Sequence, residues 1–139
     1  MTEPPHISDA VDLIAALRAA VAGTVDDGAR RRAEYSSDAG NYRVVPRVVV
    51  YPVDADDVAA VVDVARAHRV PVTARGGGTS IAGNAIGPGI VLDLGRLARV
   101  LDVDAEGRTA VVQPGVVLTD LQRRVAPLGL RFGPDPSSQ

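Results

Sequence analysis

The sequence predicts a mixed α+β fold, and three observations carry that prediction. Apolar runs at 48–51 and 70–74 flank a stretch with helical spacing, which is typical of a strand–helix–strand unit with parallel strands. A third apolar run, at 90–94, follows a glycine-rich segment. The runs 100–103 and 109–113 flank a short polar turn and predict an antiparallel hairpin. Parallel strands followed by a hairpin exclude a purely doubly wound sheet.

Residues 1–45 are expected to form a helical arm and a loop ahead of the sheet. Apolar side chains at helical spacing predict a helix over 8–22, and Gly23 suits its C-terminal turn. A second, more polar helical stretch is expected over 26–35. Residues 35–42 are rich in turn formers and lack periodicity, so we expect a loop there.

Three aspartates follow the strand expected at 48–51. Asp54 is placed to cap the next helix, and Asp56 and Asp57 fall in its first turn, where the helix dipole favours acids. Capping explains this cluster better than metal binding, so no metal site is predicted. His68 lies near the other end of the same helix and is expected to be exposed or to interact with its C-terminal dipole.

The last regular element is expected to be a helix over 118–125, whose apolar side chains share one face. Pro127 and Gly129 should end it. Asp135 stands between two prolines and suits a turn better than acid–base chemistry. We therefore name no catalytic residue in this chain.

The composition excludes several classes of chemistry. The chain has no cysteine, which rules out disulfides, cysteine-ligated metals and thiol nucleophiles within it. All 15 basic residues are arginine, so a P-loop lysine and a Schiff-base lysine are absent. His6 and His68 cannot supply a histidine-rich metal site.

The charge and the apolar pattern also limit the partners. A net charge of -2 argues against nucleic-acid binding, and the run Arg30–Arg32 is best explained as a solvated face. No apolar run approaches the about 20 residues that a membrane span needs. The first residues lack the features of a secretory signal. A cytoplasmic protein is expected.

A glycine-rich loop follows the strand expected at 70–74. Three consecutive glycines, Gly76–Gly78, cost about 0.5–1 kcal/mol each relative to alanine in regular structure, so they need a physical reason. Without side chains, successive N–H groups can converge on an anion. Thr79 and Ser80 add hydroxyl donors, and the charge of Arg75 could serve the anion or brace the loop. The glycines alone leave two alternatives open: a phosphate cradle or a plain turn.

The segment Arg75–Ser80, with Ala82-Gly83-Asn84 beyond it, resembles the pyrophosphate loop of the FAD-linked oxidase family. This family has the vanillyl-alcohol-oxidase (PCMH) type of FAD-binding fold and includes D-lactate and glycolate dehydrogenases. Four more segments agree in order and spacing: Tyr35–Asp38, Pro52–Val58, Val112–Val116 and Gly133–Ser137. The likeness covers about residues 35–139 and favours the phosphate cradle over the plain turn.

The resemblance implies how FAD would be bound. The backbone of the loop would wrap the FAD pyrophosphate, and neighbouring turns would line the cofactor. Where many relatives carry a histidine that attaches flavin covalently, this chain has Thr79, which implies non-covalent binding. The implied cofactor-binding residues are Arg75, Gly76, Gly77, Gly78, Thr79, Ser80, Gly83, Asn84, Pro114, Gly115 and Pro134.

The resemblance also implies a division of the chain. Residues 46–139 would be the first half of a PCMH-type FAD-binding domain: a βαβ subdomain and the truncated start of an antiparallel one. The rest of the parent enzyme would supply the catalytic part and act on a small 2-hydroxy acid. Apolar residues that the missing half normally covers would then favour self-association. The alternative is a self-standing, non-catalytic module that binds a nucleotide or a partner protein.

Overall fold

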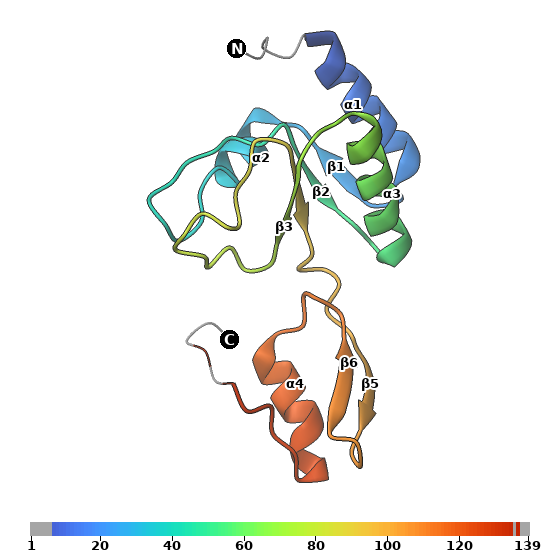
Figure 1. Ribbon diagram of the computed structural model, residues 1–139, viewed down its shortest axis with the longest axis vertical. Helices are drawn as coiled ribbons and strands as arrows, with labels where there is room; N and C mark the ends of the chain where they lie inside the picture. The colour runs from blue at the N-terminus through green and yellow to red at the C-terminus, as the bar shows by residue number, and fades with distance from the viewer. Residues whose placement is uncertain (1–6, 135, 137–139) are drawn as a thin grey trace. The chain divides into compact units, whose positions relative to one another are not determined.

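The parallel strands of the sheet form at the apolar runs that the sequence predicts. A computed structural model describes residues 7–134 and 136 and divides the chain into two compact units, Met1–Asp93 and Leu94–Gln139 (Figure 1). In the first unit, β2 (Val48–Tyr51), β3 (Val72–Arg75) and β4 (Ile90–Asp93) run parallel. Strand β1 (Thr24–Asp26) pairs antiparallel with β2, so the sheet order is β1-β2-β4-β3.

The strand–helix–strand unit is present, but its two strands are not neighbours. Helix α3 (Ala55–Ala67) connects β2 to β3, and the later strand β4 lies between them. The parallel direction was predicted correctly. The strand order could not be, because it depends on contacts between residues far apart in the chain.

The central strands are buried on both faces. All four residues of β2 are buried, and such continuous burial is typical of parallel strands that are covered on both sides. Val49, Tyr51 and Val91 form one cluster, against which Tyr35 packs. The alternate residues of β2 and β4 point to the opposite face. Helices α1 (Ile7–Ala20) and α3 lie side by side along the sheet (Figure 1).

The largest differences from the predicted elements lie in the first 45 residues, and β3 also begins and ends later than the predicted strand 70–74. The strand β1 lies where the sequence predicts a turn and the start of a helix, and α2 is shorter than predicted, at Ala29–Glu34. A strand of three residues has too few positions to show an alternating pattern. Its identity comes from pairing with β2.

Asp57 joins the end of α1 to the start of α3. Its two carboxylate oxygens accept hydrogen bonds from the backbone N–H groups of Ala22 (2.8 Å), Gly23 (2.9 Å) and Val53 (2.9 Å). Burial by itself would raise the pKa of Asp57, but these three donors lower it below the ordinary value. The predicted cap is confirmed, because Asp54 Oδ1 accepts from the Asp57 N–H at 2.9 Å.

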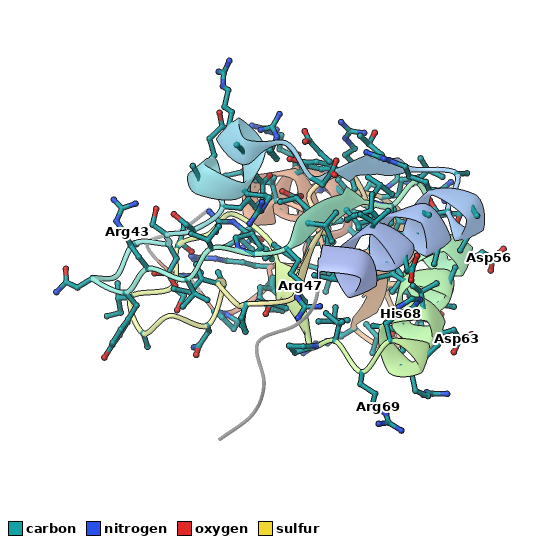
Figure 2. All side chains as sticks on the ribbon, turned by 90° about the horizontal axis from the view of Figure 1, so that it is seen from above. Arg43, Arg47, Asp56, Asp63, His68 and Arg69 are labelled. Carbon is teal, nitrogen blue, oxygen red and sulfur yellow. The ribbon has the colours of Figure 1, made fainter. Side chains whose placement is uncertain are left out.

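The other charged residues of α3 lie away from the sheet. Asp56 and Asp63 are exposed on this helix, and Figure 2 shows them at the outer side of the first unit. His68 is the C-cap residue of α3 and is half-buried, and its N–H donates to Val64 O at 3.0 Å. Arg69 then turns the chain with a positive φ of 53°.

The second unit contains a hairpin and one helix. Strands β5 (Val100–Asp104) and β6 (Thr109–Val112) pair antiparallel, with an irregularity between Val100 and Asp102. Helix α4 (Leu118–Val125) buries Leu121 and Val125 and continues into the 3-10 turn η1 (Ala126–Leu128). Gly129 ends this turn in the left-handed region, and the prediction that it ends the helical segment is confirmed.

None of the helices in the described part of the chain is long and apolar enough to cross a membrane.

Candidate functional site

The glycine loop leaves the sheet at the carboxyl end of β3. The ends of parallel strands meet at one edge of a sheet, and the register places Tyr51, Arg75 and Asp93, the last residues of β2, β3 and β4, across from one another. In open α/β sheets this edge is the usual place for a ligand. Figure 1 shows the loop after β3 beside the loop that follows α2.

Gly76 and Gly77 face open space. A Cβ built on Gly76 would meet nothing within 4 Å, and one on Gly77 would meet Thr79 Cγ2 at 3.6 Å. Neither glycine has the positive φ that would by itself favour this residue. The protein therefore gives no internal steric reason for these two glycines, and a ligand that approaches the backbone closely would supply one.

The N–H groups of this loop are available to a ligand. Within residues 7–134 and 136, the backbone N–H groups of Gly76, Gly77, Gly78 and Thr79 donate no hydrogen bond. Gly76, Gly77 and Thr79 are exposed. Successive backbone donors without protein partners are the chemistry that binds a phosphate or diphosphate. The loop thus has both the space and the donors for such an anion.

Arg75 braces this loop from within. Its Nη1 donates to Ser37 O at 2.9 Å and to Ala85 O at 3.2 Å, so it connects both ends of the glycine-rich segment to the neighbouring loop. Gly78 has a φ of 68°, and a Cβ there would overlap the Arg75 guanidinium. Of the two roles open to Arg75 in the sequence, the structure shows the bracing contacts.

Tyr35 lies beneath Arg75 at the carboxyl edge of the sheet. The guanidinium carbon of Arg75 is 4.7 Å from the centre of the Tyr35 ring. The Tyr35 hydroxyl donates to Asp93 Oδ2 at 2.5 Å, and the ring meets Tyr51 edge-on with centroids 6.0 Å apart. Burial, and then the hydrogen bond to Asp93, raise the pKa of Tyr35. The phenol stays protonated and acts as a donor.

The rest of the loop is held by local contacts. Ser80 Oγ accepts hydrogen bonds from Ala82 N (3.2 Å) and Asn84 N (3.1 Å), so this hydroxyl shapes the loop and keeps its own proton for donation. Gly83 has a φ of 79° and lies against the ring of Tyr42. Asn84 and Thr79 are exposed. The first unit thus collects eight of the predicted site residues on one loop: Arg75, Gly76, Gly77, Gly78, Thr79, Ser80, Gly83 and Asn84.

The other predicted site residues belong to the second unit. Pro114 and Gly115 form the turn after β6, where Gly115 N donates to Leu97 O at 2.8 Å. A Cβ on Gly115 would overlap carbonyl oxygens of this unit. Pro134 is exposed, and Asp135 lies outside the described residues.

Sequence reasoning gave no role to Tyr35, Asp93 or Asp38. One oxygen of Asp38, Oδ2, is buried without a hydrogen-bond partner among the described residues, while Oδ1 accepts from Gly40 N at 2.8 Å. Tyr35 and Asp38 belong to the segment Tyr35–Asp38, which the sequence connects only with the family likeness. One feature of the sequence does single out Tyr35, because the chain has only three tyrosines.

The arginines of the run Arg30–Arg32 make contacts within the first unit. Arg30 and Arg31 pair with Glu34, at 2.9 and 2.6 Å. Arg32 Nε donates to Pro46 O at 2.8 Å. These pairings agree with the interpretation of the run as a solvated face of α2.

Comparisons with known proteins identify the family. Residues 46–139 match the family model described as FAD binding domain. The glycolate oxidase subunit GlcD of Bacillus subtilis is 38% identical over 116 residues, which cover 81% of this chain and 25% of that protein. D-2-hydroxyglutarate dehydrogenase of Pseudomonas putida is 38% identical over 111 residues, which cover 77% of this chain and 11% of that protein.

Among solved structures, an alkyldihydroxyacetonephosphate synthase superposes with a TM-score of 0.78 at 22% identity. The match covers 98% of this chain and 28% of that one, and at this identity it shows the fold alone. The chain therefore spans about a quarter or less of the length of the curated relatives described above.

Proposed function

This chain belongs to the FAD binding domain family, and from that premise we propose that its loop Gly76–Ser80 holds the diphosphate of FAD through backbone amides. The family match confirms the resemblance drawn from the loop and the four other segments. FAD is the cofactor of this family. The assignment of FAD to particular residues is our proposal.

The observation that supports the proposal is the open backbone at Gly76 and Gly77. Both positions have room for a side chain within the protein and yet carry none, and their N–H groups have no partner in the described part of the chain. A diphosphate carries several acceptor oxygens and a negative charge, and it can satisfy such donors at short range. The hydroxyls of Thr79 and Ser80 can add donors.

The remaining contacts follow from the family likeness. Gly83 and Asn84 would continue the loop towards the flavin, and Pro114, Gly115 and Pro134 would line the cofactor from the second unit. Bound FAD supplies a hydride acceptor. This chain's own residues contribute binding and orientation, and we assign no catalytic role to any of them.

The names of the relatives indicate the substrate class of the whole protein. Glycolate and D-2-hydroxyglutarate are both 2-hydroxy acids, and the proteins named for them are 38% identical to this chain. We propose that the whole protein is a flavin-dependent oxidoreductase that acts on a small 2-hydroxy acid. A cytoplasmic location stays a prediction of the sequence, which cell fractionation would test.

A direct test replaces Gly77 by valine. Flavin fluorescence titration should show FAD binding by the unaltered chain and a loss of about tenfold or more in Gly77→Val, equivalent to about 1.4 kcal/mol or more. The melting temperature should stay the same, because the space beside Gly77 is open. Ala59→Val, at an exposed position of α3, is the control for added bulk and should bind FAD normally.

Two results would contradict the proposal. An unaltered chain that binds no FAD would remove the function, and a Gly77→Val variant with unchanged affinity would remove the loop from it. The same samples test the mode of attachment. Acid precipitation should release all flavin into the supernatant, because Thr79 offers no ring nitrogen for a covalent bond, and retained flavin would contradict non-covalent binding.

A further inference from the structure

We propose that Tyr35 is a positioning residue for the cofactor: its ring supports Arg75, and Arg75 holds the Gly76–Ser80 loop in the shape that receives the diphosphate. This inference rests on the proposed function of the loop. It adds Tyr35, which lies 40 positions before Arg75 in the chain. The Tyr35 hydroxyl donates to Asp93 and not to the glycine run.

Tyr35 contacts the final residue of all three parallel strands. Its hydroxyl donates to Asp93 at the end of β4, its ring meets Tyr51 at the end of β2, and Arg75 at the end of β3 lies over the ring. The ring also packs against the buried cluster that contains Val49 and Val91. Tyr35 is therefore held by contacts with the buried, carboxyl end of the sheet.

Arg75 connects Tyr35 to the loop. A planar guanidinium stacks on an aromatic ring while its edges stay free to donate, and Nη1 here donates to Ser37 O and Ala85 O. These two carbonyls belong to the loop after α2 and to the far end of the glycine-rich segment. The arginine thus ties the start of that segment to its end.

Gly78 completes the arrangement. Its positive φ and the absence of a Cβ let the backbone pass directly over the guanidinium, where any side chain would overlap it. Arg75 thus contacts both Tyr35 at the sheet edge and the backbone at Gly78 in the middle of the loop, and these three residues are called the stack below. Gly76 and Gly77 lie outside this stack, with their space open.

The two possible roles of Arg75, as a cation for the diphosphate and as a planar group that positions the loop, predict different results for lysine at this position. If Arg75 served the diphosphate only as a cation, lysine would replace it with little loss. In a positioning role, lysine fails because it has neither a planar group to stack on Tyr35 nor the fork that reaches two carbonyls. We expect Arg75→Lys to weaken FAD binding by about tenfold, the size typical of losing a partner that orients a binding group.

Substitutions at Tyr35 test whether its ring supports Arg75. Tyr35→Leu removes the ring beneath Arg75 and should weaken FAD binding by about tenfold, whereas Tyr35→Phe keeps the ring and should recover most of the affinity. Phe132→Leu makes the same aromatic-to-leucine change at a half-exposed position of the second unit and should bind as the unaltered chain does. FAD affinity is measured by flavin fluorescence, together with hydrogen exchange of the loop amides without FAD.

The outcomes distinguish this inference from the proposed function. Faster exchange of the 76–80 amides in Tyr35→Leu, with weaker FAD binding and recovery in Tyr35→Phe, supports the positioning role. If Gly77→Val loses FAD but Tyr35→Leu and Arg75→Lys retain it, the loop stands and the positioning role is wrong. If Tyr35→Leu does not fold, Arg75→Lys decides: unchanged affinity there overturns the inference. If Gly77→Val also retains FAD, both proposals fail.

Discussion

The two units of this chain differ in how completely they bury their strands. In the first unit, every residue of β2 and nearly all of β4 are buried, between a helix pair and the Tyr35 cluster. In the second, all four residues of β6 are exposed, and the buried apolar side chains are Leu97, Leu121 and Val125 among the described residues. The difference indicates that the first unit holds its loop on a rigid scaffold, which a binding site needs, while the second exposes surface that another partner can cover.

The largest expected effect tests the core of the first unit. Ile90 is fully buried in β4, between β2 and β3, and Ile90→Ala should lower the free energy of unfolding by about 2–5 kcal/mol. Leu121, which is 9% exposed in α4 and lines a cavity of about 330 Å³, should cost less on truncation, about 1–2 kcal/mol. Urea unfolding measures both. Equal losses would contradict the contrast between the units.

A smaller effect is expected at the link between α1 and α3. Asp57→Asn keeps the shape but removes acceptor capacity from three backbone N–H groups, so we expect a loss of about 1–3 kcal/mol at pH 7. Asp56→Asn, in the same helical turn but exposed, is the control and should change stability by less than about 0.5 kcal/mol.

The pH dependence of Asp57 has a defined sign. Its pKa is lowered in the folded state because the three N–H donors outweigh burial. The ionised carboxylate therefore contributes stability above its unfolded pKa of about 4, and that contribution is lost as the pH falls through the lower, folded-state pKa. The difference between the unaltered chain and Asp57→Asn should shrink in acid. A difference that stays constant from pH 7 down to strongly acidic pH would contradict this assignment.

The sequence predicts those elements whose signal is local. The strands at Val48–Tyr51 and Ile90–Asp93 are short apolar runs, and the helix that Asp54 caps begins where its side chain indicates. Strand β1 was missed because its three residues carry no pattern of their own. The position of β4 between β2 and β3 was missed because strand order depends on contacts that no local window contains.

The same distinction applies to the candidate site. The glycine run identifies the loop from the sequence, because three glycines without a turn motif need a physical reason. The support beneath it cannot be found that way. Tyr35 and Asp93 are 58 residues apart, and they meet because Tyr35, which follows α2, packs against the edge where the parallel strands end. The sequence leaves Arg75 two roles, serving the anion or bracing the loop, and its bracing partners, Ser37 and Ala85, can be found only from the structure.

The smallest expected effect on stability tests the exposed surface of the second unit. Leu101, Val111 and Phe132 are 54%, 55% and 48% exposed, and among the described residues β6 pairs with β5 alone, which leaves an open strand edge. We propose that these exposed apolar residues and the open strand edge drive self-association of the chain, because both favour contact between copies. Val111→Lys should change the unfolding free energy by less than about 0.5 kcal/mol and yet shift sedimentation towards monomer.

Val53→Lys adds the same charge at a 51% exposed residue of the first unit and should leave the association unchanged. A monodisperse monomer of the unaltered chain would show that this surface needs no partner, and the contrast between the two units would then concern core packing alone.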